Sequence, residues 1–209
     1  MASIFLKSTI TLLLIFSALS VATAFVLDTD GEPLFNQVNN SRYYILPQTI
    51  GIGGGLTRTT KNPELPCPYY ITRDNDETSS GMPLYISSPL RILFIPLSSP
   101  VHISFEEMTT ICIQESMGWR VISDDSTGRL YVSTGAGRGP GRFTIEQAES
   151  ESSNNVYKIR YIGALDSEAG AGDLGFFKED GLLGITDDIP LTVVFKKAFD
   201  VPEETTTSM

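Results

Sequence analysis

Side chains suited to acid–base or nucleophilic chemistry are scarce in this chain of 209 residues, which has one histidine and two cysteines. The histidine, His102, lies in an alternating run whose odd-numbered positions, from 101 to 105, are apolar. We therefore expect His102 to point toward solvent together with Ser104, which argues against a catalytic triad. A Cys/His zinc site generally needs four such ligands, or three together with a water molecule, so two cysteines and one histidine argue against it. The sequence predicts no enzyme, no metal site and no cofactor.

Two other patterns resemble ligand sites only superficially. The glycine-rich run 137–142 lacks the last glycine of the dinucleotide-binding motif and follows no βαβ pattern, and no P-loop motif occurs. The acidic pairs at 124–125 and 187–188 lie between apolar runs, where hydration is the default, and a glycosidase needs two carboxylates at a fixed separation. We expect all of these residues to form turns.

One segment, residues 86–96 (ISSPLRILFIP), carries a single charge inside an apolar run. Pro89 and Pro96 exclude a helix there and favour an extended backbone. Arg91 is the charged residue. From the local pattern alone, a strand whose arginine faces solvent is the simpler interpretation.

The secondary structure that carries these residues is predicted to consist of β-strands. Short alternating runs rich in β-branched and aromatic residues are separated by Gly, Asp, Asn and Ser clusters, and no segment keeps a helical period for three turns. The runs cover residues 43–46, 101–105, 120–122, 130–132, 142–145, 156–161 and 191–195. This pattern predicts one all-β domain, either a barrel or a sandwich.

The N-terminal 24 residues read as a secretory signal. Lys7 precedes a short apolar run at 10–19, and Ala22-Thr23-Ala24 has the small-x-small form of a signal-peptidase site. We expect a signal peptide at 1–24, a domain at 25–201 and a polar, disordered tail at 202–209. The mature protein is then secreted or vacuolar, with no membrane attachment.

Composition and cysteine usage refine the expected environment. The formal charge of −10 argues against nucleic acid as a partner, because phosphate binding requires clustered Lys and Arg. Export favours a Cys67–Cys112 disulfide over free thiols, and closing a loop of that size stabilises the fold by about 4 kcal/mol. Asn39, in Asn39-Asn40-Ser41, is a candidate glycosylation site. Nothing suggests an oligomer, so a monomer is expected.

Three parts of the sequence together resemble the plant Kunitz-type inhibitors of the soybean trypsin inhibitor family. The first is FVLDTDGEPL at 25–34, continued by YYIL at 43–46 and GGGL at 53–56. The second is ISSPLRI at 86–92, which is similar to the reactive-site loop of that family. The third is DLG at 173–175 with IPLTVVF at 189–195, which is similar to its closing strands.

The resemblance implies a β-trefoil: a six-stranded barrel capped by hairpins, in three pseudo-repeats. It also implies an inhibitor of trypsin-like serine proteases, in which Arg91 is the primary specificity residue and Arg91–Ile92 the scissile bond. The expected reactive-site loop consists of Ser88, Pro89, Leu90, Arg91, Ile92 and Leu93. Asn36 is expected to hydrogen-bond that loop from beneath, Cys67–Cys112 to match a family disulfide, and Trp119 to be a core residue.

The sequence departs from the family pattern at two places. The positions of a second family disulfide hold Ile162 and Ala171, so both partners are absent together. The stretch between Leu34 and Tyr43 is three residues longer than the family signature and contains Asn39. Two other functions are left open: a non-inhibitory storage, taste-modifying or stress-response trefoil of the same family, and a carbohydrate-binding trefoil.

Overall fold

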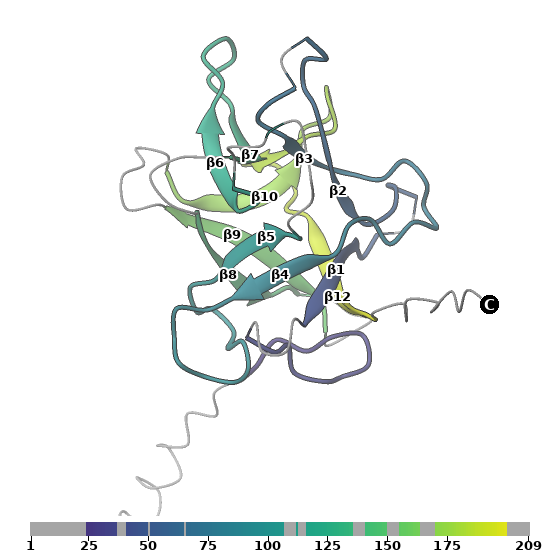
Figure 1. Ribbon diagram of the computed structural model, residues 1–209, viewed down its shortest axis with the longest axis vertical. Coiled ribbons are helices and arrows are strands. Elements are labelled where there is room, and N and C mark those ends of the chain that lie inside the picture. The colour runs from purple at the N-terminus through teal and green to yellow at the C-terminus, as the bar shows by residue number, and fades with distance from the viewer. Residues whose placement is uncertain are drawn as a thin grey trace, which may run out of the picture.

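Figure 1 shows a computed structural model of the protein. It describes residues 24–36, 41–49, 51–64, 66–106, 112, 116–135, 141–149, 155–163 and 170–199. Residues 1–23 of the predicted signal peptide, the sequon residue Asn39 and the predicted tail lie outside these residues, and all three stay predictions. Within the described part, no helix has the length and apolarity needed to cross a membrane.

The described chain is built from β-strands joined by turns and loops. Buried and more exposed residues alternate along β1 and β9, because successive side chains of a strand point to opposite faces. The strands are β1 (Arg42–Pro47), β2 (Leu56–Thr59), β3 (Tyr70–Arg73), β4 (Leu84–Ser87), β5 (His102–Phe105), β6 (Trp119–Ser123), β7 (Leu130–Thr134), β8 (Arg142–Gln147), β9 (Tyr157–Gly163), β10 (Gly172–Phe176), β11 (Leu183–Ile185) and β12 (Thr192–Ala198).

Six strands close into a barrel. β1 pairs with β12 and β4, β4 pairs with β5, and β9 pairs with β8 and β12, all of them antiparallel. The ring closes between β5 and β8, where Val101, directly before β5, forms a bridge to Phe143. Closure leaves these strands no free edge on which another chain could add.

The other six strands form three hairpins: β2–β3, β6–β7 and β10–β11. They meet at one end of the barrel, at the top of Figure 1, because β7 pairs with both β3 and β11. Each hairpin lies in the chain between two barrel strands, so the same four-strand unit occurs three times. The fold is a β-trefoil, as expected.

Aromatic side chains fill much of the core. Trp119 is fully buried between Phe105 and Phe143, with both ring-centroid distances at 6.0 Å. Tyr161 continues the row at 5.5 Å from Phe143. These residues come from β5, β6, β8 and β9, so one cluster joins barrel strands to a cap hairpin. Trp119 is thus a core residue, as the family resemblance implied.

Five strands, namely β2, β3, β4, β10 and β11, were not marked by alternation in the sequence. Each has five residues or fewer, and β5, β6 and β7, which alternation did mark, are not longer than that, so length alone does not explain the difference. Glycines in β10 and β11 also read as turn formers, yet Gly175 and Gly184 face each other in the sheet. A Cβ at Gly184 would lie 2.4 Å from the Leu130 carbonyl oxygen, so the missing side chain permits close packing of β11 on β7.

His102 corrects one expectation and the cysteines confirm another. His102 lies on the less buried face of β5, but it is only half-exposed, and its Nδ1 lies 3.0 Å from the Gly141 carbonyl oxygen. The closing contact of the barrel, rather than water, therefore surrounds much of this side chain. The Cys67–Cys112 disulfide is formed and the chain has no free cysteine.

Candidate functional site

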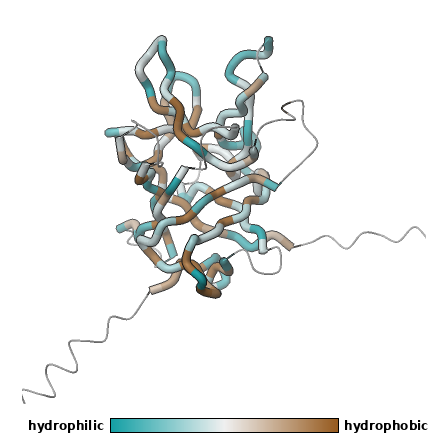
Figure 2. Tube along the Cα trace, turned by 60° about the vertical axis from the view of Figure 1, so that its left-hand side comes forward, coloured by the Kyte–Doolittle hydropathy of each residue, from teal (hydrophilic) through white to brown (hydrophobic). Residues whose placement is uncertain are grey.

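Residues 88–97 form the first part of the connection from β4 to β5 and lie at the end of the barrel away from the hairpin cap (Figure 1). Every residue from 89 to 93 is exposed. The apolar side chains of Leu90, Ile92 and Leu93 are 47%, 38% and 50% exposed. Figure 2 shows hydrophobic positions among the loops at this lower end. A cluster of exposed apolar side chains is typical of an interaction surface.

The side chain of Asn36 lies beneath this loop. Its Nδ2 donates to the carbonyl oxygens of Leu90 at 3.0 Å and Ile92 at 2.9 Å, and more weakly to that of Ser88 at 3.4 Å. Its Oδ1 accepts from the Ser88 amide at 2.7 Å. One amide side chain thus holds the backbone on both sides of Arg91.

The loop also makes contacts within itself. The Ile92 amide donates to the Leu90 carbonyl at 2.9 Å, which closes a three-residue turn centred on Arg91. The Leu90 amide lies 3.2 Å from the Ser88 hydroxyl oxygen, which accepts its hydrogen bond. Pro89 lies between these two residues and fixes its own φ. The backbone around Arg91 is therefore constrained before any partner binds.

The Arg91 side chain is exposed and makes no ion pair or hydrogen bond with any residue that the structure describes. Its carbonyl oxygen likewise accepts no hydrogen bond from the described residues. The two neighbouring carbonyls, of Leu90 and Ile92, are both bound by Asn36. The loop therefore presents a guanidinium and one free carbonyl from an otherwise held backbone.

After Leu93 the chain returns along the N-terminal segment rather than along a barrel strand. The Asn36 amide donates to the Leu93 carbonyl at 2.8 Å, and the Ile95 amide donates to the Leu34 carbonyl at 2.9 Å. The Val26 amide completes this ladder by donating to the Ile95 carbonyl at 2.9 Å. Residues 25–36 therefore support the loop on its Ile92 side as well as through Asn36.

Buried polar groups hold the N-terminal segment in turn, and sequence reasoning did not anticipate them. The hydroxyls of Tyr43 and Tyr157 accept from the amides of Phe35 and Leu27, both at 2.9 Å. Burial raises the pKa of both tyrosines, because it disfavours the charged form of the hydroxyl. One indication of these contacts was present in the sequence: Tyr43 belongs to the family signature, and its position in a predicted strand makes it a candidate core residue.

A comparison with known families assigns the chain to one of them. The model of the legume Kunitz family, described as trypsin and protease inhibitor, matches residues 26–197. The chain belongs to this family. The match covers β1 to β11, all of β12 except its last residue, the loop at 88–97 and the supporting residue Asn36.

Individual Kunitz-family proteins are similar over nearly their full length. The trypsin inhibitor BvTI of Bauhinia variegata is 37% identical over 177 residues, which cover 83% of this chain and 95% of that inhibitor. An endogenous alpha-amylase/subtilisin inhibitor of Triticum aestivum is 35% identical over 184 residues, covering 83% of this chain and 96% of that protein. These relatives are named as inhibitors, in agreement with the expectation that this chain is not an enzyme.

A solved complex of porcine pancreatic trypsin with soybean trypsin inhibitor contains a Kunitz chain of similar structure. Its TM-score is 0.68 at 30% identity, and the match covers 84% of this chain and 99% of the other. The fold of this chain is therefore one that occurs in complex with a serine protease.

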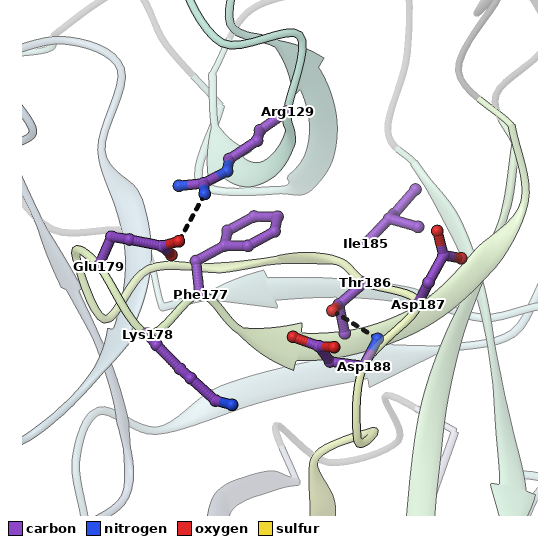
Figure 3. A pocket seen from close by; sticks show the side chains of 8 residues that line it. All are labelled: Arg129, Phe177, Lys178, Glu179, Ile185, Thr186, Asp187 and Asp188. Carbon is purple, nitrogen blue, oxygen red and sulfur yellow. Dashed lines mark hydrogen bonds and ion pairs between the residues drawn. The ribbon is translucent and has the colours of Figure 1, made fainter.

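The opposite end of this Kunitz protein holds a second surface feature, a hollow of about 300 Å³ beside the turns of the cap. Figure 3 shows that Arg129 lies over Phe177 there and reaches Glu179. The Arg129 guanidinium is 4.9 Å from the Phe177 ring centroid and donates to Glu179 at 2.8 Å. One face of Phe177, the aromatic residue among the described residues that line this hollow, is thus already occupied.

Neither end of the described structure holds a candidate metal site. No three His, Cys, Asp or Glu side chains among the described residues lie close enough together to hold a metal ion. The disulfide Cys67–Cys112 joins the segment before β3 to the segment before β6, at the cap hairpins rather than at the loop. The loop with Asn36 is therefore the candidate functional site.

Proposed function

We propose that this protein is a substrate-like inhibitor of trypsin-like serine endopeptidases, with Arg91–Ile92 as the reactive bond. The observation that carries the proposal is the contrast at Arg91. Its side chain is exposed and unpaired among the described residues, whereas the carbonyls on both sides of it are held by Asn36. An interaction loop needs this combination of a free anchor and a fixed backbone.

The chemistry of the anchor suits a trypsin-like pocket. A guanidinium pairs bidentately with a carboxylate, and it stays charged at all working pH values. Because Pro89 and Asn36 already restrict the loop, less conformational entropy is lost on binding. The inhibitor supplies no catalytic group, since the protease brings its own nucleophile and oxyanion donors.

Slow release follows from the same support. When the protease opens the Arg91–Ile92 bond, Asn36 still binds Leu90 on one side and Ile92 on the other. The new carboxylate and the new amine therefore remain near each other, and closing the bond again costs little entropy. A cut but undissociated loop keeps the protease blocked.

The test is a titration of bovine trypsin with the purified protein, followed by N-terminal sequencing of slowly cleaved material. We expect a stoichiometric end point and a new N-terminus at Ile92. Arg91→Ala should abolish the end point, whereas Lys178→Ala, which removes an exposed cation from the cap, should leave it unchanged. Wild-type protein that inhibits neither trypsin, chymotrypsin nor subtilisin would instead identify a non-inhibitory trefoil.

The cellular context is part of the proposal. The signal at 1–24 is proposed to direct the chain into the secretory pathway, so that the mature protein is a secreted or vacuolar monomer beginning at Phe25. N-terminal sequencing of protein from the plant cell medium and from the vacuole tests both points. A first residue of Met1 would contradict them.

A further inference from the structure

After the exposed residues 89–93, Phe94 is the first residue whose side chain packs against the rest of the fold. It is half-buried and contacts two rings of the N-terminal segment. Phe35 lies 5.2 Å away and Phe25 lies 5.6 Å away, measured between ring centroids. The Phe25 ring meets Phe94 edge-on, at an interplanar angle of 67°.

The two rings that contact Phe94, those of Phe35 and Phe25, are anchored differently. The Phe35 amide donates to the buried Tyr43 hydroxyl, and the Lys197 ammonium lies 5.5 Å from the Phe35 ring centroid. Phe25 is 36% exposed and lies near the end of the ladder. Its position therefore depends on its own contacts with the segment that follows the loop.

The backbone contacts around Phe25 are few. Its bridge to Pro96 is made by the Val26 amide with the Ile95 carbonyl and by the Leu97 amide with the Ala24 carbonyl, both at 2.9 Å. Cleavage after Ala24, as the sequence predicts, would remove the second acceptor. One hydrogen bond and the ring contact with Phe94 would then attach Phe25 to the loop.

We infer that Phe25 is a positioning residue of the inhibitory loop: through Phe94 it holds the Ile92 side of the Arg91–Ile92 bond in place once that bond is cut. This inference rests on the proposed function. In the cut form, water has added across the peptide bond, leaving a carboxylate on Arg91 and an ammonium on Ile92. Closing the bond again releases that water.

The intact and cut forms depend on Phe25 to different degrees. In the intact form, the covalent bond to Arg91 restrains Ile92 and Leu93 whether or not Phe94 is held. In the cut form, the new N-terminus is restrained by Asn36, by the backbone hydrogen bonds of Ile95 and by the ring contacts of Phe94. Removing the Phe25 ring therefore adds more conformational freedom to the cut form, and the equilibrium moves toward it.

The experiment measures the ratio of cut to intact inhibitor at equilibrium, approached from both sides with catalytic amounts of trypsin. The proteins are produced from the complete coding sequence, with the first residue checked by N-terminal sequencing. An aromatic contact of this kind predicts a rise in the ratio of roughly three- to tenfold for Phe25→Ala. Phe25→Tyr, which keeps the ring, should retain the wild-type ratio.

The ratio has an advantage over an inhibition constant. It depends only on the free energies of the two inhibitor forms, so a direct contact between Phe25 and the protease cannot change it. Phe199→Ala is the matched control, because Phe199 is 73% exposed and makes no ring contact with the residues that the structure describes.

Three results would overturn the inference. One is an unchanged ratio for Phe25→Ala, even with a lower melting temperature, and another is an equal rise for Phe199→Ala. Either of these leaves the proposed function intact as long as wild-type protein blocks trypsin. Wild-type protein that is not cut after Arg91 would overturn both together, so the two failures are distinguishable.

Discussion

Arg91 and Arg129 lie on exposed connections at opposite ends of the trefoil, and the protein treats them in opposite ways. Arg129 packs over Phe177 and donates to Glu179, so both its apolar face and its charge have partners (Figure 3). Arg91 has neither kind of partner among the described residues, although the backbone beside it is bound by Asn36. An arginine at the cap therefore links two turns, whereas the arginine of the loop is exposed to solvent.

The two ends differ in which groups are held by side-chain contacts. At the cap, side chains bind one another across turns, as when Tyr131 donates to Asp180 at 2.7 Å. At the loop, a side chain binds backbone groups, which fixes the path of the chain and leaves its side chains available. A binding loop requires the second arrangement, because paired side chains would have to be released before a partner could bind.

The largest expected effect is that of Arg91→Leu, and Arg129→Leu is the comparison variant. Arg91→Leu should weaken trypsin binding by about 4 kcal/mol, as for a central anchor, and should create measurable inhibition of chymotrypsin. Arg129→Leu should change neither. Inhibition constants against both proteases check this prediction, and equal effects of the two variants would remove the distinction between the two ends.

The support beneath the loop gives the next largest effect. Asn36→Asp keeps the acceptor for the Ser88 amide but removes the donors to Leu90 and Ile92, and it places a carboxylate against their carbonyls. We expect trypsin binding to weaken by about 2 kcal/mol, since each lost hydrogen bond contributes about 1 kcal/mol. The loop should also be cut faster, as followed by chromatography.

A matched control for this variant lies toward the cap. Among the described residues, Asn62 makes one side-chain contact, in which its Oδ1 accepts from the Glu64 amide at 2.9 Å, so Asn62→Asp keeps that contact. We expect neither inhibition nor the cleavage rate to change. A weaker trypsin affinity for Asn62→Asp would mean that added negative charge, rather than lost loop support, explains the result at Asn36.

Sequence reasoning reached the fold through two different kinds of information. Alternation marked the longer strands such as β9, because a half-buried strand repeats every two residues. It could not show that Val101 and Phe143 close the barrel, since pairing depends on a partner far along the chain. The trefoil itself came from the family resemblance.

The site divides in the same way. Local pattern alone favoured Arg91 as an ordinary solvent-facing residue, because nothing in residues 86–96 shows how the loop is held. Asn36 is 52 residues away from Ser88, so its role was expected from the family resemblance and not from the local pattern. The contacts of Tyr43, Tyr157 and Phe94 depend on three-dimensional packing, so they could be found only in the structure.

A smaller effect is expected from loosening the cap itself. Arg129→Ala removes the ion pair with Glu179 and the packing on Phe177, both of them at the surface. Surface ion pairs contribute little to stability, so the melting temperature should fall only slightly, and trypsin inhibition should stay at the wild-type level. A loss of inhibition without a loss of stability would show that the two ends are coupled.

The smallest effect concerns pH and the turn that follows β6. Asp124 accepts from Lys61, and also from Ser126 and the Thr127 amide, and these contacts hold the pKa of its carboxyl well below the ordinary range. A lowered folded-state pKa means that its stabilisation is complete above the unfolded-state value, about 4. The stabilisation is then lost progressively as the pH falls below that value.

Asp124→Asn should therefore flatten the acid limb of a plot of melting temperature against pH. The neighbouring Asp125 provides the comparison, because it makes no hydrogen bond or ion pair with the described residues, and Asp125→Asn should leave that limb unchanged. Residues 88–97 contain no acidic side chain or histidine, so neither variant should alter trypsin inhibition at neutral pH. An identical acid limb for wild type and Asp124→Asn would show that this turn is held by its hydroxyl and amide contacts rather than by charge, and the cap would then resemble the loop after all.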